Sequence, residues 1–223
     1  YATIFAVDES PLQEGLIWVG SDDGLIHLTK DGGATWENVT PKKMPDWMMI
    51  NSIDASSFDS GTAYIAGTRY KLGDFTPYLY VTDDYGKNWK LITNGIKDEH
   101  FTRVLRSDKV NKNILYAGTE TGMYISYDRG NSWNEFQKNL PIVPITDLTI
   151  KDNSLIVATQ GRSIWMIDDL TVFHQLTPST DQMKLYKPKD SYRMGGAGGR
   201  KSLTAGTNLP NGAIIHYLSL IHI

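Results

Sequence analysis

Short stretches in which apolar and polar residues alternate recur along most of this chain. Alternation with a period of two, bounded by Gly, Pro, Asn and Asp, is typical of β-strands. Inner strands are predicted at 3–7, 50–54, 101–105 and 145–150, second strands at 16–20, 63–67, 115–118 and 155–158, third strands at 25–28, 79–81 and 123–125, and outer strands at 36–39, 89–92 and 133–136. The pattern therefore predicts an all-β chain built from units of four strands.

An eight-residue motif, S/T-x-D-x-G-x-x-W, joins the third and outer strands of the first three units. It occurs at 29–36, 82–89 and 126–133, and its aspartates lie 53 and 44 residues apart, a period typical of propeller blades. Asp followed by Gly favours a turn, because the carboxylate accepts backbone N–H groups and glycine adopts positive φ. The sequence therefore predicts a β-propeller fragment of about four four-stranded blades.

The motif residues are interpreted as structural, with the aspartates forming the hairpins and each tryptophan packing beneath its own turn. They are Asp31, Gly33, Trp36, Asp84, Gly86, Trp89, Asp128, Gly130 and Trp133. A fourth unit lacks the Asp-x-Gly turn at 161–170, and its outer strand is predicted at 172–176. A degenerate repeat is usual at the end of an array, so this unit is interpreted as the last blade.

The repeats predict a division of the chain into four parts. Residues 1–177 form the blades, 178–207 form a linker with a glycine-rich stretch at 194–199, 208–218 form the first strand of a truncated second β domain, and 219–223 form a tail of non-native appearance. Because the chain starts inside a strand without methionine, it is expected to be a fragment whose remaining blades come from an N-terminal region.

Composition narrows the function classes. The 223 residues are 40% hydrophobic and 21% charged, which is ordinary for a globular protein, and no apolar run is long enough to span a bilayer. The net charge of −3, with scattered lysines, disfavours nucleic-acid binding. Without cysteine, disulfides and thiol catalysis are excluded. Four of the five histidines, His27, His100, His174 and His216, show no metal-ligand spacing, and no metal or cofactor is predicted.

Candidate chemistry lies in the loops opposite the motif turns. The motif aspartates are unsuited to catalysis, because a glycosidase needs two carboxylates about 5 to 10 Å apart and these aspartates lie on separate blades. Weak catalytic candidates are Asp22, Asp74 and Glu120, and candidate binding residues are Trp47, Arg69, Tyr70, Asp74, Phe75 and Arg162. The long loop at 68–77 suits a sugar or a peptide. In the alternative interpretation it covers a neighbouring blade, with Arg69 paired to Asp74.

The three octets resemble Asp-boxes, or bacterial neuraminidase repeats, which occur in sialidases, xyloglucanase-type glycoside hydrolases, sortilin-type receptors and photosystem assembly factors. Stretches at 63–67, 71–80, 115–122, 139–141 and 158–169 are similar to large bacterial BNR-repeat glycosyl hydrolases or sortilin-like proteins. The resemblance covers residues 1 to about 218. It implies a protein that is secreted, periplasmic or on the cell surface, and an appended β-sandwich that begins near Asn208.

Two functions stay open at this point. The favoured hypothesis is an exported propeller that binds a protein, peptide or glycan through its loop face. The alternative is a glycoside hydrolase of the xyloglucanase or sialidase kind, with carboxylates on the loop face or in the N-terminal half. A sialidase requires an arginine triad and a tyrosine nucleophile, and arginines are few here.

Overall fold

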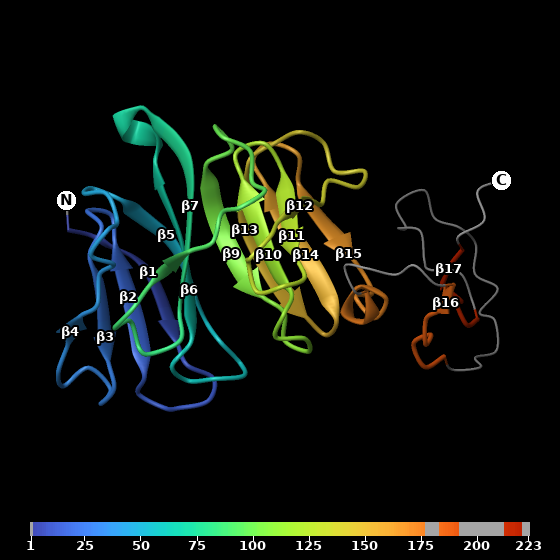
Figure 1. Cartoon of the computed structure of the whole chain (residues 1–223), viewed down its shortest axis with the longest axis horizontal. Coiled ribbons are helices and arrows are strands. Elements are labelled where there is room, and N and C mark those ends of the chain that lie inside the picture. The colour runs from blue at the N-terminus through green and yellow to red at the C-terminus, as the bar shows by residue number, and fades with distance from the viewer. Residues whose placement is uncertain (1, 177–182, 192–211, 220–223) are drawn as a thin grey trace. The chain divides into compact units, whose positions relative to one another are not determined.

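Most of the expected strands are present, and they form separate antiparallel sheets in chain order (Figure 1). The structure is a computed structural model that describes residues 2–176, 183–191 and 212–219. The first sheet contains β1 (Ile4–Glu9), β2 (Ile17–Ser21), β3 (Ile26–Thr29) and β4 (Glu37–Asn38). The second contains β5 (Met49–Ala55), β6 (Ala63–Arg69), β7 (Asp74–Thr82) and β8 (Lys90–Leu91). The third contains β9 (Thr102–Ser107), β10 (Leu115–Thr119), β11 (Met123–Ser126) and β12 (Asn134–Glu135).

The fourth sheet has three strands, β13 (Ile145–Lys151), β14 (Ser154–Thr159) and β15 (Ile164–Ile167). The outer strand predicted at 172–176 is wrong, because the 3₁₀ helix η2 (Phe173–Gln175) lies there. The Asp169 carboxylate accepts the N–H of Thr171, and the N–H of His174 bonds to the carbonyl of Leu170. These local bonds curl the chain where an Asp-x-Gly turn would have reversed it.

The chain divides into two compact units, Tyr1–Asp168 and Asp169–Ile223. In the second unit β16 (Lys184–Leu185) pairs with β17 (Tyr217–Leu218). β16 therefore lies inside the segment that was predicted to be a linker, and β17 lies inside the predicted strand at 208–218. The glycine-rich stretch at 194–199 and the tail residues 220–223 lie outside the described residues. No helix in the described part is long and apolar enough to cross a membrane.

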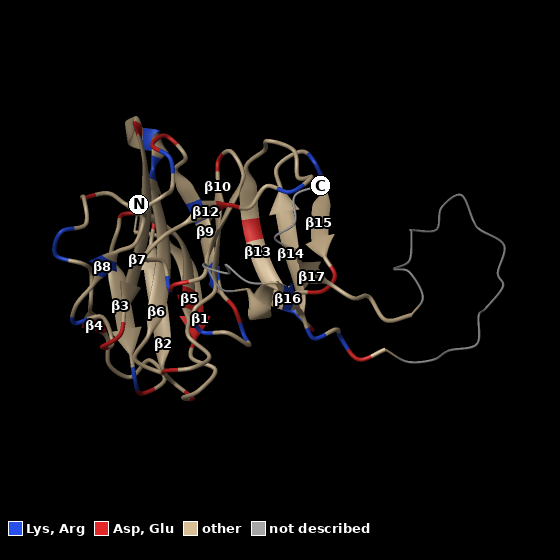
Figure 2. Ribbon diagram, turned by 45° about the vertical axis from the view of Figure 1, so that its right-hand side comes forward, with Lys and Arg blue, Asp and Glu red and all other residues tan. Residues whose placement is uncertain are grey.

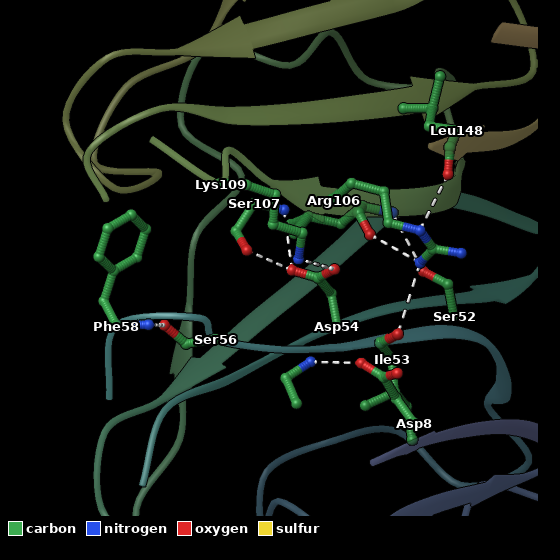
Figure 3. Close-up of polar contacts among 12 residues, drawn as sticks. Asp8, Ser52, Ile53, Asp54, Ser56, Phe58, Arg106, Ser107, Lys109 and Leu148 are labelled. Atoms are coloured by element: carbon green, nitrogen blue, oxygen red, sulfur yellow. Dashed lines mark hydrogen bonds and ion pairs between the residues drawn. The ribbon is translucent and has the colours of Figure 1, made fainter. Parts of the chain in front are cut away.

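Side chains link the inner strands β1, β5 and β9 to one another (Figure 3). The Asp8 carboxylate accepts the N–H of Ala55 on β5 at 2.7 Å. One strand further, the Asp54 carboxylate accepts the N–H of Ser107 on β9 at 2.8 Å. Asp8 and Asp54 occupy the same register, since each faces an aromatic residue on its second strand. The same hydrogen bond, from a backbone N–H of one inner strand to an aspartate of the preceding one, therefore joins the first sheet to the second and the second to the third.

Between the third and fourth sheets this arrangement is reversed. Arg106 occupies the register position of the two aspartates and donates to the carbonyl of Leu148 at 3.0 Å and to the carboxylate of Asp147 at 2.9 Å. Its guanidinium also reaches back to the carbonyl of Ile53 (Figure 3). The fourth sheet is thus linked to the third by a donor on β9 and acceptors on β13. In the first two links the donor is instead a backbone N–H of the following inner strand.

Two of the three motif tryptophans contact the preceding unit, whereas Trp36 lies against Gly33 of its own turn as predicted. The indole N–H of Trp89 donates to the carbonyl of Val39 at 2.7 Å, and that of Trp133 donates to the carbonyl of Ile92 at 2.6 Å. Each acceptor lies directly after the outer strand of the preceding sheet, and each tryptophan lies directly before the outer strand of its own sheet. Trp133 is 4% exposed, whereas Trp36 in the first sheet is 46% exposed.

Side chains at the variable positions of the motif also make contacts between consecutive sheets. The ammonium of Lys30 in the first motif lies 4.5 Å from the ring centre of Tyr85 in the second. The guanidinium of Arg129 in the third motif pairs with the carboxylate of Asp83 in the second at 2.5 Å. In each case the position after the Ser or Thr meets the position after the Asp of the next motif. The two interfaces therefore use different chemistry at the same place.

Candidate functional site

The candidate site lies beside the hairpin formed by β6 and β7, which projects beyond the other strand ends at the top of Figure 1. The hairpin pairs Arg69 with Asp74 and is closed by the 3₁₀ helix η1 (Tyr70–Leu72) and Gly73. Gly73 has φ +76°, a conformation that glycine adopts without strain, so the chain turns back immediately after η1. Basic residues stand at the top of the hairpin in Figure 2.

An ion pair fixes the closed end of this hairpin, next to its turn. The Arg69 guanidinium lies 2.7 Å from the Asp74 carboxylate and also donates to the carbonyl of Asp46 at 3.0 Å. The Tyr78 hydroxyl donates to the same carboxylate at 2.8 Å. Partial burial raises the pKa of Asp74, but hydrogen bonds from Thr76 and Tyr78 outweigh burial and hold the pKa below its usual value of 3.8. Asp74 is therefore an ionised structural partner of Arg69.

Aromatic stacking holds the hairpin against the third sheet. The Tyr70 and Phe101 rings are nearly parallel with centres 5.3 Å apart, and Phe75 lies 5.9 Å from Phe101. The Arg103 guanidinium lies over the Phe101 ring and pairs with Glu120 at 2.6 Å. This stacking holds the hairpin in one conformation before a ligand binds. Binding beside the hairpin therefore costs little conformational entropy.

A cavity of about 480 Å³ opens on the side of the hairpin that faces the first sheet. Its lining is Asp22, Trp47, Met49, Thr68, Arg69, Tyr70, Lys71 and Leu72. Trp47 is 56% exposed and adopts φ +60°, a backbone conformation that is uncommon for a tryptophan. Thr68 is 1% exposed, and its hydroxyl oxygen has no hydrogen-bond partner in the described structure. The cavity thus presents exposed apolar surface, and the Thr68 hydroxyl lies buried beneath it.

The structure brings together some of the candidate residues and separates others. Trp47, Arg69, Tyr70 and Asp22 line the cavity, whereas Phe75 is absent from its lining and lies 5.9 Å from Phe101, on which Tyr70 also stacks. Asp22 accepts the N–H of Thr3 at 2.9 Å. Arg162 lies in the loop between β14 and β15, where its carbonyl accepts the Trp165 indole N–H. Sequence reasoning missed Met49, because it lies inside a strand and only its position beside Trp47 indicates the cavity.

The motif carboxylates are fully used by their own turns. Each aspartate accepts the hydroxyl of the Ser or Thr two residues before it and the N–H of the residue four positions after it. Its second oxygen accepts the side chain of that later residue, at 2.6 Å for Thr35, 2.7 Å for Asn88 and 2.6 Å for Ser132. These contacts leave each carboxylate oxygen occupied. In the described residues, no three His, Asp or Glu side chains form a group that could hold a metal ion.

The same bonds predict acid sensitivity. Hydrogen bonds from Thr35 and Thr29 lower the pKa of Asp31 from 3.8 to about 2, and hydrogen bonds from Asn88 lower the pKa of Asp84. The folded state therefore holds these protons more weakly than the unfolded state, so the stabilisation is present above pH 3.8 and is lost as the pH falls toward about 2. Thermal melts across this range should show a falling melting temperature, with a shallower fall in Asp31→Asn. An equal slope in both proteins would contradict the assignment.

Comparison with known proteins gives a family and a fold. A family model described as "Sortilin, neurotensin receptor 3" (Sortilin-Vps10) matches residues 77–193. A structure titled "YCF48 bound to D1 peptide" aligns with a TM-score of 0.57 and 21% identity over 75% of this chain and 52% of that chain. The GH74 xyloglucanase from Xanthomonas campestris aligns with a TM-score of 0.59 and 16% identity, over 84% of this chain and 32% of the enzyme.

A second YCF48 structure, from Cyanidioschyzon merolae, aligns with a TM-score of 0.54 and 17% identity, over 75% of this chain and 53% of that chain. The chain thus spans about half the length of the YCF48 structures. At these identities the likeness shows the fold alone, and it confirms the predicted β-propeller. No curated protein matches the sequence.

Proposed function

We infer the function of this chain from the premise that it belongs to the Sortilin-Vps10 family, whose model matches more than half of its length. We propose that it binds a segment of another protein in the cavity beside the β6–β7 hairpin. The observation that carries the proposal is the cavity itself, which is large enough for one or two side chains and presents Trp47, Tyr70 and Leu72. Aromatic side chains in a preformed cavity are the usual anchors of a peptide ligand.

The polar groups of the cavity suit the backbone of such a ligand. The Thr68 hydroxyl oxygen is buried beneath the lining and is closed to a bound segment, whereas the exposed ammonium of Lys71 can donate to a peptide carbonyl. Lys71 and Arg69 stand at the rim, and Arg69 is already fixed by Asp74. A ligand that offers an apolar side chain and nearby backbone polar groups therefore matches the lining. YCF48, a protein of the same fold, has been solved bound to a D1 peptide, and this supports the proposal by analogy.

The carboxylates argue for binding over glycoside hydrolysis. A glycosidase acid needs a raised pKa, whereas the pKa of Asp74 is lowered. Glu120 is paired with Arg103, and Asp22 accepts a backbone N–H. All three weak catalytic candidates therefore have structural partners. The rival function remains an outcome of the test: a product released from a polysaccharide panel, lost in Asp74→Asn, would overturn the binding proposal.

We expect Trp47→Ala to weaken peptide binding by about 10- to 30-fold, the effect of removing a tryptophan anchor from an interface. The measurement is fluorescence anisotropy with a peptide selected from a displayed random library on the unmodified chain. The melting temperature should change little, because Trp47 is more than half exposed. Trp36→Ala is the matched control, since Trp36 is also half-exposed but lies outside the cavity. Equal affinity in both variants would place the peptide elsewhere.

A further inference from the structure

Two interfaces that should be equivalent are sealed differently around their motif tryptophans. Between the second and third sheets, the backbone carbonyl of Asn94 accepts the backbone N–H of Trp133 at 2.9 Å. The side-chain amide of Asn94 donates to the backbone carbonyl of Asn131 at 3.1 Å. Gly95 then lies so close to Trp133 that an added Cβ would stand 2.4 Å from its carbonyl oxygen. The connecting segment therefore lies directly over the tryptophan and buries it.

Between the first and second sheets this closure is missing. Aligned on the motif, Pro41 and Lys42 occupy the positions of Asn94 and Gly95. Proline has no side-chain donor to imitate Asn94, and lysine has a Cβ that the close approach of Gly95 forbids. No bond between Trp89 and Pro41 equivalent to the one from Trp133 occurs in the described residues. The segment consequently stands off Trp89.

A groove of about 620 Å³ lies between the segment that contains Pro41 and Lys42 and the Trp89 side chain. Its apolar wall includes Val39, Tyr80, Trp89 and Leu91, and Leu91 is 49% exposed. The outermost strands β4 and β8 both contribute to the lining, and each has an unpaired edge in its sheet. Edge strands can bind an extended segment through backbone hydrogen bonds.

The charge of the groove selects the kind of segment. Lys42, Lys43 and Lys87 line it and are exposed, while Glu37 is its single acidic residue, so its side chains carry a net charge of +2. None of the three lysines takes part in an ion pair within the part of the chain that the structure describes. The chain as a whole carries −3, so this local excess of positive charge opposes the overall balance.

We propose that this groove is a second binding site, which takes an acidic, extended segment of a partner protein with an apolar side chain placed against Trp89. Carboxylates of the segment pair with Lys42, Lys43 and Lys87, and its apolar side chain fills the space that Asn94 and Gly95 fill at the next interface. The site is separate from the cavity beside the β6–β7 hairpin, since the two share no lining residue.

The test uses the next interface as a template. The double variant Pro41→Asn/Lys42→Gly copies the sealed connection into the open one, and Lys43→Glu/Lys87→Glu reverses the charge while Pro41 and Lys42 are kept. The probe is a fluorescein-labelled peptide of alternating Glu and Phe, with two control peptides in which Ser replaces Phe or Lys replaces Glu. We expect the anisotropy of the Glu/Phe peptide to rise on binding to the unmodified chain, and its affinity to be at least about tenfold lower for either variant. The affinity should also fall as the salt concentration is raised from about 0.05 to about 0.5 M.

Trp47→Ala should bind this probe as the unmodified chain does, which separates failure of this proposal from failure of the first one. Three results would overturn it: no binding of the Glu/Phe peptide, equal binding of the Ser-substituted peptide, or tighter binding of a single-stranded oligonucleotide or a heparin fragment. If the lysine variants only increase aggregation, the lysines protect the strand edges and the groove is not a binding site. A thermal melt of each variant confirms that it is folded before its binding is scored.

Discussion

Replacing Trp133 with alanine is expected to lower the free energy of unfolding by about 3 to 5 kcal/mol, the usual cost of removing a buried tryptophan. Trp133 is 4% exposed, and its ring fills the contact between the second and third sheets. The substitution leaves a cavity, and it also leaves the carbonyl of Ile92 without the indole N–H that lies 2.6 Å away. Urea denaturation followed by circular dichroism measures the change.

Trp36→Ala is the internal control for this prediction. It removes the same residue from the same position of the first motif, but the side chain is 46% exposed, so a loss of less than about 1 kcal/mol is expected. Trp133→Phe keeps an aromatic ring but removes the N–H donor and part of the indole volume, so its cost should lie between the costs of the two alanine variants. Equal losses from Trp36→Ala and Trp133→Ala would show that the tryptophan acts through its own turn and not through the neighbouring sheet.

Asp54→Ala is expected to destabilise the protein by about 2 to 4 kcal/mol, because it leaves a buried backbone donor without a partner. The Asp54 carboxylate is almost completely buried and accepts both the N–H of Ser107 at 2.8 Å and its hydroxyl at 2.5 Å. Lys109 lies 3.6 Å from the other oxygen. Removing the carboxylate therefore weakens the link between β5 and β9, which a urea titration would detect.

Two further substitutions test whether the acceptor oxygen and the burial of Asp54 determine the size of this loss. Asp54→Asn keeps an acceptor oxygen near Ser107, so about half of the loss should remain. Asp8→Ala removes the equivalent carboxylate of the first sheet, which is less buried and accepts one backbone N–H, and should cost about 1 kcal/mol. The ranking is the test: if Asp8→Ala costs as much as Asp54→Ala, burial of the carboxylate does not determine the strength of the link.

The sequence predicted the architecture well because the relevant signals are local. Alternation marks strands, and Asp-x-Gly marks the turn that joins two of them, so the sheets around Asp31, Asp84 and Asp128 were predicted close to their observed positions. The direction of two of the three tryptophans was not predicted, because periodicity identifies the face of a strand and not the sheet that it meets. The outer strand at 172–176 was not predicted correctly either, since local bonds around Asp169 override a weak strand pattern.

The candidate site was predicted in part. The segment predicted as a long loop at 68–77 is mostly the β6–β7 hairpin, because β7 begins at Asp74, and its residues 68–72 line the cavity together with Trp47. Phe75 was grouped with them, but it is absent from the cavity lining and lies with Phe101. The groove at Trp89 gave no signal in its own residues. It becomes visible only when the backbone of Gly95 is compared in space with that of Lys42.

The paired variable letters of the motif restrict how this propeller can gain or lose blades. Lys30 meets an aromatic ring, whereas Asp83 meets an arginine. A deletion of the second unit would set Lys30 directly against Arg129, which places two cations where an ion pair now stands. In-frame loss or reshuffling of these repeats is thus penalised by charge, although the first three repeats share the same four-stranded fold. Natural variants of this protein should therefore change residues 83 and 129 together, as correlated substitutions across a sheet boundary.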